Sequence, residues 1–386
     1  MNLRARRRWL ARAARTAAGL ALDGVGARVA GALALGAGGN RAQARPELLT
    51  ASFAPAASLP ANGGTGSGGN AVEPVAPPRD VLGRPVPLPA PSARIADGWP
   101  AHNALLLTLG AADRIVATVC LPSARPWMYR VAPGLRRAAT SQVGAFNAEE
   151  LLLRGAQLAF VPPGDPAGRR LAAAGIATVE TSFRSFATMR DCLLTTAALL
   201  GDDAPARARD YLAALDATRA ELDARLRPLP AAQRPSVLHL ARAEPLVADG
   251  RNTIVNEWIE AAGGRNAAAA LDGNLREITL EQALAWDPDI VVLAGAGALQ
   301  RPAGLGLLRA VREGRLFINP DGVFPWDRYG SELALQLPWA ASRFHPALFG
   351  QLDLVARTRD FYRRFFNHRL DDDAARRILA GLPPLP

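Results

Sequence analysis

The chain has 386 residues, of which 49% are hydrophobic, so it can form two domains with substantial cores, and a wholly disordered protein is excluded. Its formal charge of +10 is concentrated in residues 1–45, which hold nine arginines and one acid, whereas the other 36 basic and 34 acidic residues nearly balance. This balance argues against a nucleic-acid-binding protein.

Residues 1–44 have the features of an export signal. A basic cluster at Arg6–Arg8 precedes an apolar stretch at Val29–Ala37 and a small-residue cleavage motif at Ala42–Ala44. The paired arginines are similar to a twin-arginine signal, which leaves the Sec and twin-arginine routes both open. Because Asp23 interrupts the apolar region, a wrongly assigned start with an arginine-rich tail is the alternative. We predict a periplasmic protein.

Residues 45–92 are rich in Pro, Gly, Ala and Ser, and residues 62–70 consist entirely of Gly, Ser, Thr and Asn. This composition is typical of a disordered linker, so we expect the folded part to begin at residue 93. No segment after the export signal has the roughly 18 consecutive apolar residues of a membrane span. Two cysteines, Cys120 and Cys192, are too few for a disulfide scaffold, and we expect buried thiols, with one bridge as the alternative.

From residue 93 onward, short apolar segments alternate with helical runs rich in Ala and Leu. Such alternation predicts an α/β fold in which parallel sheets are covered by helices on both faces. The expected strands are Arg114–Val119, Leu158–Val161, Ala177–Val179, Ser236–Leu240, Ile290–Leu293 and Leu316–Ile318.

One long helix separates the two sets of strands. Residues 203–227 contain no glycine, and apolar side chains recur there at steps of three and four residues, as on one face of a helix. A helix of this length spans roughly 37 Å, which is the width of a domain. We therefore predict a rigid linking helix at 203–228 between an N-terminal lobe at 93–202 and a C-terminal lobe at 229–386.

An internal repeat relates the two lobes. Residues 147–161 correspond to residues 279–293 at a constant offset of 132, and each copy supplies an N-cap, an acid in the first helical turn, an apolar helix face and a buried strand. Two similar Rossmann-like lobes joined by one rigid helix are expected to leave a cleft between them, where a ligand could bind.

The order and spacing of further short motifs support a resemblance. They include Leu109–Ile115, Gly250–Thr253, Ala262–Asn266, Leu308–Arg315 and the ending from His345 to Phe365. Together with the repeat, they make residues 94–382 similar to the helix-hinged (class III) periplasmic binding proteins of ABC importers. The segment Gly155–Gln157 departs from the Lys-Pro-Asp turn of that family, whereas Asp287–Asp289 is closer to it.

The resemblance implies the function. Such a protein would capture a metal chelate, with an iron siderophore as the first candidate and haem, cobalamin or a small metallophore as alternatives. It would deliver the chelate to the transmembrane subunits of an ABC permease, and we expect a monomer that is not an enzyme and needs no cofactor. A chelatase-like α/β enzyme and a signalling domain of the same fold are the rival hypotheses, although the sequence has no phosphate loop or GxSxG motif.

The resemblance also implies one acid on each lobe that docks to arginines of the permease. The matching residues are Glu149 and Glu281, which occupy equivalent places in the repeat. The simpler alternative is that both carboxylates only interact favourably with the dipole of the helix that follows.

Candidate ligand contacts should lie on loops after the strands, because ligands bind beyond the carboxyl ends of parallel strands. Mixed aromatic and cationic residues suit a flat anionic chelate, while the alternative is that the aromatic side chains pack under the loops. The candidates are Arg125, Trp127, Tyr129, Arg130, Arg242, Trp326, Arg328 and Tyr329.

Direct metal ligation by side chains has little support. The four histidines are scattered and His239 falls within an expected strand, which favours a core position for it. Tyr129 or Tyr329 could ligate haem iron as a phenolate. We predict no metal site and no catalytic residues.

Overall fold

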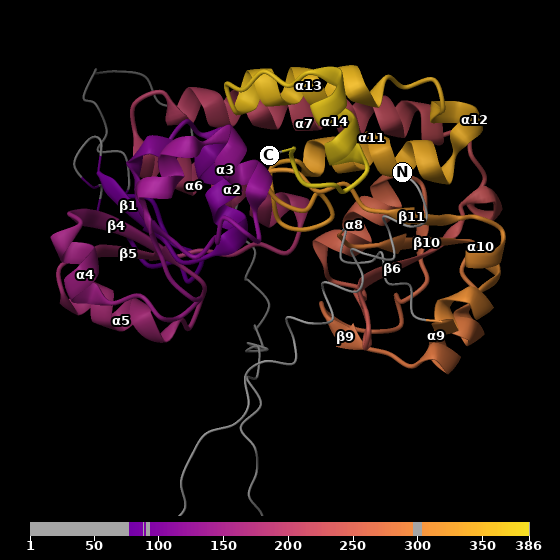
Figure 1. Cartoon of the computed structure of the whole chain (residues 1–386), viewed down its shortest axis with the longest axis horizontal. Helices are drawn as coiled ribbons and strands as arrows, with labels where there is room; N and C mark the ends of the chain where they lie inside the picture. Colours follow the sequence, from indigo (N-terminus) through magenta and orange to yellow (C-terminus); the bar gives the residue numbers. More distant parts are fainter. Residues whose placement is uncertain (1–76, 88, 90–92, 296–302, 386) are drawn as a thin grey trace, which may run out of the picture. The chain divides into compact units, whose positions relative to one another are not determined.

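A computed structural model describes residues 77–87, 89, 93–295 and 303–385 (Figure 1). They belong to one compact unit, Val72–Pro386. The predicted export signal and most of the predicted linker lie outside the described residues. No helix among the described residues is long and apolar enough to cross a membrane.

The N-terminal lobe is built on a five-stranded parallel sheet with the order β3-β2-β1-β4-β5. Its strands are β1 (Arg94–Asp97), β2 (Ile115–Thr118), β3 (Ala139–Thr140), β4 (Ala156–Val161) and β5 (Ala177–Glu180). The helices of this lobe are α2 (Pro100–Thr108), α3 (Pro126–Val131), α4 (Ala148–Leu153), α5 (Pro166–Ala173) and α6 (Phe186–Leu200), with short 3-10 helices at Ala112–Arg114 and Pro133–Arg137.

The C-terminal lobe is built on a mixed sheet with the order β11-β10-β6-β7-β9, in which β8 also pairs with β6. Its strands are β6 (Ser236–Ala243), β7 (Leu246–Ala248), β8 (Arg265–Asn266), β9 (Arg276–Glu277), β10 (Ile290–Leu293) and β11 (Leu316–Ile318). The three predicted strands β6, β10 and β11 are parallel. The short strands β7 and β9 were not predicted. Strand β7 is antiparallel to β6, because a two-residue turn reverses the chain between them, and β9 pairs antiparallel with β7.

The remaining helices lie in the part of the chain that follows α7 (Ala204–Leu226). They are α8 (Ile254–Ala261), α9 (Leu280–Trp286), α10 (Arg309–Arg312), α11 (Leu333–Phe344), α12 (Pro346–Phe349), α13 (Leu354–Phe365) and α14 (Asp372–Leu379), with 3-10 helices at Ala231–Gln233 and Ala303–Leu307.

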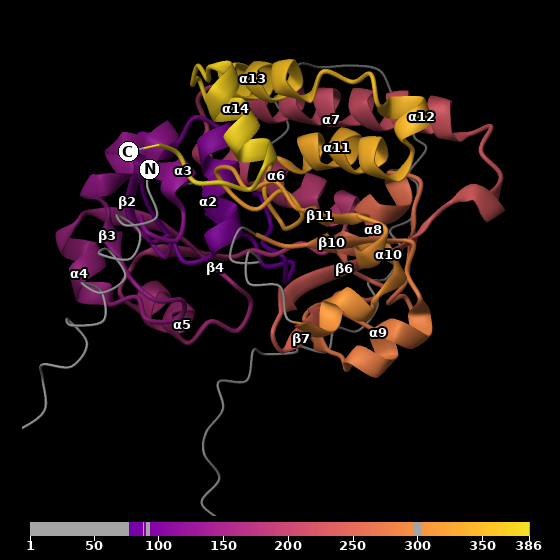
Figure 2. The same cartoon turned by 45° about the vertical axis from the view of Figure 1, so that its right-hand side comes forward.

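Between the lobes runs the single long helix α7 (Ala204–Leu226), which extends above both sheets (Figures 1 and 2). Tyr211, Leu215, Leu222 and Leu226 are buried, as the apolar periodicity predicted. The helix packs against α6 and α11 and also contacts α2 and α8. The predicted fold class, two α/β lobes joined by one long helix, is confirmed.

Each sheet has two apolar faces because successive side chains of a strand point to opposite sides. In β4, Leu158 and Phe160 face a large core shared by both lobes, whereas Ala159 and Val161 face a cluster confined to the N-terminal lobe. In the second lobe, Leu238 and Leu293 face a separate local cluster. The shared core also includes Tyr211 of α7, so the lobes are joined through packed side chains as well as through a helix.

The C-terminal segment crosses back to the first lobe. Helix α13 lies along α7 (Figures 1 and 2), and Arg357 pairs with Glu221 of α7 at 2.8 Å. Beyond α14, the carbonyl of Leu382 accepts a 2.8 Å hydrogen bond from the indole of Trp127 on α3. The final residues therefore tie the predicted second lobe, 229–386, to the first.

The predicted linker extends too far toward the folded part. Residues 77–87 form a turn in which the buried carboxylate of Asp80 accepts hydrogen bonds from the backbone of Leu82 and Arg84. Val81 donates a hydrogen bond to the carbonyl of Glu180, beside the edge strand β5. The composition of this stretch resembled that of a linker, but its polar groups have partners on the first lobe.

Candidate functional site

Three aromatic side chains from both lobes meet beyond the ends of the parallel strands. Trp99 follows β1, Phe183 follows β5, and Tyr329 follows β11 in the second lobe. The ring centroids of Trp99 and Phe183 lie 5.1 Å apart, and Tyr329 is 6.1 Å from Trp99 and 5.6 Å from Phe183. Trp99 and Tyr329 are half-buried and keep part of their surface accessible, whereas Phe183 is only 3% exposed and supports the other two rings from within the fold. This aromatic trio is the place where a ligand could contact both lobes at once.

Polar groups adjoin the trio. The side chain of Asn274 lies next to the hydroxyl of Tyr329 and acts to lower its pKa. Burial raises the pKa of Tyr329 to about 12, although the nearby guanidinium groups of Arg328 and Arg184 act against the shift. The hydroxyl therefore stays protonated and can donate a hydrogen bond. The exposed side chain of Arg184 adds positive charge at the same place.

Asn274 also presents an acceptor. Its Oδ1 atom is buried and has no hydrogen-bond partner among the described residues. Leaving a buried carbonyl oxygen unpaired costs about 1–3 kcal/mol, so such an atom is expected to meet a donor in the working protein. The trio, Arg184 and Asn274 together offer aromatic surface, positive charge, a donor and an acceptor.

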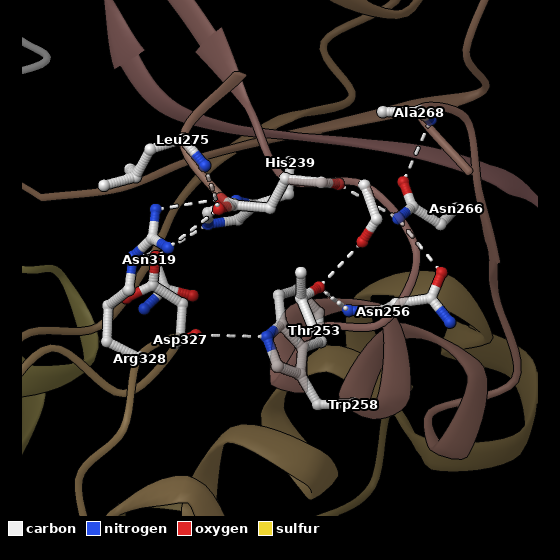
Figure 3. Close-up of polar contacts among 12 residues, drawn as sticks. His239, Thr253, Asn256, Trp258, Asn266, Ala268, Leu275, Asn319, Asp327 and Arg328 are labelled. Carbon is white, nitrogen blue, oxygen red and sulfur yellow. Dashed lines mark hydrogen bonds and ion pairs between the residues drawn. The ribbon is translucent and has the colours of Figure 1, made fainter. Parts of the chain in front are cut away.

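A buried charged network supports the loops that carry Asn274 and Tyr329 (Figure 3). His239 donates from Nδ1 to Asp249 at 3.0 Å and from Nε2 to Asp327 at 2.6 Å. Arg328 donates to both carboxylate oxygens of Asp249, at 3.0 and 2.9 Å. The backbone N–H of Leu275, whose φ of 55° lies in the left-handed region, donates to the same carboxylate at 3.0 Å.

The charges in this network stabilise one another. Burial by itself would lower the pKa of His239, but the bonds to Asp249 and Asp327 raise it and favour the imidazolium. Burial likewise acts to raise the pKa of Asp249, but Arg328 and His239 hold it well below its usual range. Arg328, a predicted ligand contact, is engaged here and only 14% of its side chain is exposed. Its role is to fix the loop that presents Tyr329.

Thr253 is the N-cap residue of α8. Its hydroxyl accepts a 3.0 Å hydrogen bond from the backbone of Asn256 and donates one of 2.7 Å to the carbonyl of Gly250. Trp258 of the same helix donates its indole N–H to the carbonyl of Asp327 at 3.2 Å (Figure 3). These bonds attach α8 to the network rather than leaving its N-terminus open to an anion.

Three of the predicted ligand contacts are core residues. Their aromatic side chains pack under the loops, which was the alternative to ligand binding. Trp127 is 3% exposed, Tyr129 is 1% exposed and Trp326 is fully buried. Their polar atoms have internal partners, because Tyr129 donates to the carbonyl of Cys120 at 2.6 Å and the indole of Trp326 donates to Glu332 at 3.0 Å. Their burial leaves no surface for a ligand. Tyr129 is therefore also unavailable as a phenolate ligand.

The predicted arginines lie in different surroundings. Arg125 stacks over the ring of Phe324, 4.7 Å from its centroid, and so joins the loop after β2 to the loop after β11. Arg130 is exposed on α3. Arg242 is exposed on β6, beside the turn to β7, where its guanidinium lies 4.0 Å from Glu277. The loop after β2 and the loop after β11 therefore do face each other, as predicted. They meet through the contact of Arg125 with Phe324.

The trio could have been found only in part from the sequence. Trp99 lies two residues beyond β1, and Phe183 lies three residues beyond β5, so the rule about strand ends applies to both. The prediction considered the loop after β2 instead, because it holds a dense aromatic and cationic segment. Asn274 carries no comparable signal in the sequence.

Both predicted docking acids are exposed at the starts of matching helices. Glu149 lies in the first turn of α4 after the cap Asn147, and Glu281 lies in the first turn of α9 after the cap Thr279. Glu149 borders a hollow of about 410 Å³, which is also lined by Arg170. The pKa of Glu281 is lowered by its own backbone N–H and by the hydroxyl of Thr279.

The buried cysteines and the histidines do not form a metal site. Cys120 and Cys192 are free thiols, and burial raises the pKa of each to about 12. Within the described ranges, no group of three or more His, Cys, Asp or Glu side chains is arranged to hold a metal ion.

Comparison with known proteins agrees with the predicted resemblance. Residues 166–321 match the family model of periplasmic binding proteins. This match covers about two fifths of the chain, from α5 to the loop after β11. Proteins of this family bind solutes in the periplasm and are not enzymes.

Several solved periplasmic binding proteins have the same fold. The structure of MolA from Haemophilus influenzae bound to molybdate matches with a TM-score of 0.67 and 20% identity, over 76% of this chain and 98% of MolA. A periplasmic solute-binding protein from Veillonella parvula matches with a TM-score of 0.66 and 22% identity, over 78% and 96%. CeuE from Helicobacter pylori with bound Ni(II) matches with a TM-score of 0.62 and 16% identity, over 78% and 98%.

By sequence, the molybdate-binding protein MolA is 26% identical over 125 residues, which is 31% of this chain and 36% of MolA. That alignment therefore spans about a third of its relative.

Proposed function

We propose that this binding protein is the solute-capturing component of an ABC importer and that its ligand is an anionic metal chelate held between the two lobes at the aromatic trio. The observation that carries the proposal is the meeting of Trp99 and Phe183 from one lobe with Tyr329 from the other. Partly exposed rings suit the organic shell of a chelate, and Arg184 would neutralise its negative charge. Iron siderophores are the first members of this class to test.

A small oxyanion is the second candidate. It is favoured by the sequence similarity to MolA, which is named as a molybdate-binding protein. A tetrahedral oxyanion is bound mainly by hydrogen-bond donors, and Arg184 and the hydroxyl of Tyr329 are such donors. The aromatic area of the trio favours the chelate, because an oxyanion makes little use of it.

Calorimetric titration of the purified chain with ferric siderophores, haem, cobalamin and molybdate tests the proposal. We expect one of the chelates to bind in the micromolar range or tighter, and Tyr329→Phe to weaken that binding about tenfold through loss of one hydrogen bond. Tyr129→Phe is the matched control, because it removes a buried hydroxyl away from the trio and should leave the affinity unchanged. Equal effects of the two substitutions, or binding of none of these ligands, would contradict the proposed site.

We also propose that Glu149 and Glu281 dock to cationic side chains of the membrane permease. Their equivalent placement on two similar lobes suits a partner with two related contact points. The double substitution Glu149→Ala with Glu281→Ala should abolish uptake in cells and leave ligand affinity unchanged. Asp373→Ala, which removes a carboxylate that is 84% exposed on α14, serves as the control. A weakened ligand affinity in the double variant would reject the docking role.

A further inference from the structure

The two docking helices share a second feature beside their acids. Leu152 lies three residues after Glu149, and Leu284 lies three residues after Glu281. Leu152 is 48% exposed and Leu284 is 38% exposed. The two leucines are related by the same 132-residue offset as the acids, so each lobe presents one acid and one leucine in the same register.

Helix geometry places each pair on one surface. Side chains three residues apart are neighbours on a helix, so the leucine adjoins the carboxylate. The opposite face is occupied, because Leu151 packs into the local core of the first lobe and Ala283 into that of the second. The acid and the leucine therefore form the outer face of α4 and of α9.

The repetition distinguishes these leucines from others at the surface. A single exposed leucine is ordinary and has no special meaning. Here the same exposed apolar residue recurs beside a carboxylate on both lobes, although the neighbouring positions have diverged. Glu150 corresponds to Gln282, and Leu151 corresponds to Ala283.

The first lobe offers the larger contact. Leu153, which is 90% exposed, stands where the second lobe has Ala285. The hollow of about 410 Å³ that Glu149 borders has room for a side chain of a partner. Glu150 forms an ion pair with Arg154 at 3.1 Å, so the two acids of this turn are not equivalent.

We propose that Leu152 and Leu284 form the apolar part of the contact with the membrane permease. The partner surface would carry, at each of two points, a cationic side chain flanked by apolar groups. This inference rests on the proposed docking role of Glu149 and Glu281. It adds the apolar residues that would stabilise the complex with the permease after the charged groups have brought the two proteins together. Charged contacts steer association and weaken with salt, whereas buried apolar contacts persist.

The test uses the double variant Leu152→Ala with Leu284→Ala and the importer that the chain serves, reconstituted in lipid nanodiscs. We expect permease affinity to fall at least tenfold at low salt, and binding at about 0.5 M salt, where exposed charge pairs are screened, to be lost. Ligand affinity should stay unchanged. Leu348→Ala is the control, because Leu348 is 43% exposed on α12, away from both docking helices.

The outcomes separate this inference from the proposed function. If removing the two acids weakens docking but removing the two leucines does not, the inference is wrong and the proposed function stands. If neither double variant changes docking, the docking role itself is wrong. If sedimentation shows that the wild-type chain self-associates and the leucine variant does not, while permease affinity is unchanged, the surface joins two copies of this chain and the inference is overturned.

Discussion

Thr108 of the first lobe donates a 2.7 Å hydrogen bond to the hydroxyl of Ser331 in the second lobe. Both residues are fully buried. The carbonyl of Ser331 also accepts a 2.8 Å hydrogen bond from the hydroxyl of Tyr211 on the linking helix. The two lobes and the helix between them therefore meet at Ser331, which lies two residues after Tyr329 of the aromatic trio.

The first prediction concerns the coupling of these two hydroxyl groups. In a double-mutant cycle of the free energy of unfolding, Thr108→Val and Ser331→Ala should show a coupling of about 1 kcal/mol, because each substitution removes the hydrogen bond between the two hydroxyls. Thr108→Val leaves the buried hydroxyl of Ser331 without this partner, whereas Ser331→Ala leaves Thr108 with its bond to the carbonyl of Ala104. Chemical denaturation measures it. Thr178→Val is the control, since Thr178 bonds to the backbone of Ile176 and should combine additively with Ser331→Ala. Additive effects of Thr108→Val and Ser331→Ala would show that the lobes are not coupled here.

The second prediction concerns lobe movement. Because both lobes contribute to one hydrophobic core and the C-terminal segment returns to Trp127, ligand binding should change the relative position of the lobes only slightly. Small-angle scattering with and without a bound chelate should show a change in the radius of gyration of less than about 1 Å, whereas wide hinge closure would produce more. A large compaction would contradict this prediction.

The similarity of the two lobes could be predicted from the sequence, because the repeat consists of helix caps and apolar spacings that act over a few residues. Asn147 and Thr279 do cap their helices, accepting hydrogen bonds from the backbone of Glu150 and Gln282. Apolar periodicity also predicted which face of α7 is buried. Such features depend on neighbours within a few residues and can be read from spacing alone.

The candidate site was harder to predict because it depends on contacts between distant residues. Trp127 and Tyr329 both lie in segments that mix aromatic residues with arginine, yet the first is buried and the second is partly exposed. Trp127 packs into the shared core, and the carbonyl of the tail residue Leu382 accepts its indole N–H from 255 positions away. No pattern of spacing within either segment contains this information.

The third prediction concerns the buried charged network. Asp249→Asn should destabilise the fold by about 3–5 kcal/mol, because Arg328 and His239 would lose their shared carboxylate while remaining buried. Ligand affinity should fall as well, since the same carboxylate holds the loops of Asn274 and Tyr329. Asp216→Asn is the matched control, because it breaks an Asp–Arg pair that is about half exposed and should cost less than about 1 kcal/mol. Equal losses of stability in the two variants would contradict the supporting role of Asp249.

The fourth prediction concerns pH and the fully buried Glu332. Burial raises its pKa to about 7, although hydrogen bonds from Tyr362 and the loop at Val323–Trp326 act in the opposite direction. Between about pH 4.5 and pH 7 the folded protein therefore holds a proton that the unfolded chain releases. The stabilisation from this group is complete below about pH 4.5 and is lost as the pH rises through about 7.

Replacing this carboxyl should remove the pH dependence. From pH 4.5 to pH 8, the unfolding free energy of the wild type should fall by about 3 kcal/mol relative to that of Glu332→Gln. Each unit of pKa shift corresponds to about 1.4 kcal/mol. Urea unfolding at several pH values measures this. Parallel curves for the two proteins would show that Glu332 does not titrate in this range.

The central claim is that a chelate binds at the aromatic trio, where the two lobes meet. Native mass spectrometry of the protein isolated from its own cells tests this claim most directly. Combined with an absorption spectrum, it should show a retained metal-containing compound on the wild-type chain and little or none on a variant carrying Trp99→Leu and Tyr329→Phe. Equal retention by both proteins would contradict the account, and so would an adduct with the mass of a bare oxyanion, which would favour the second candidate ligand.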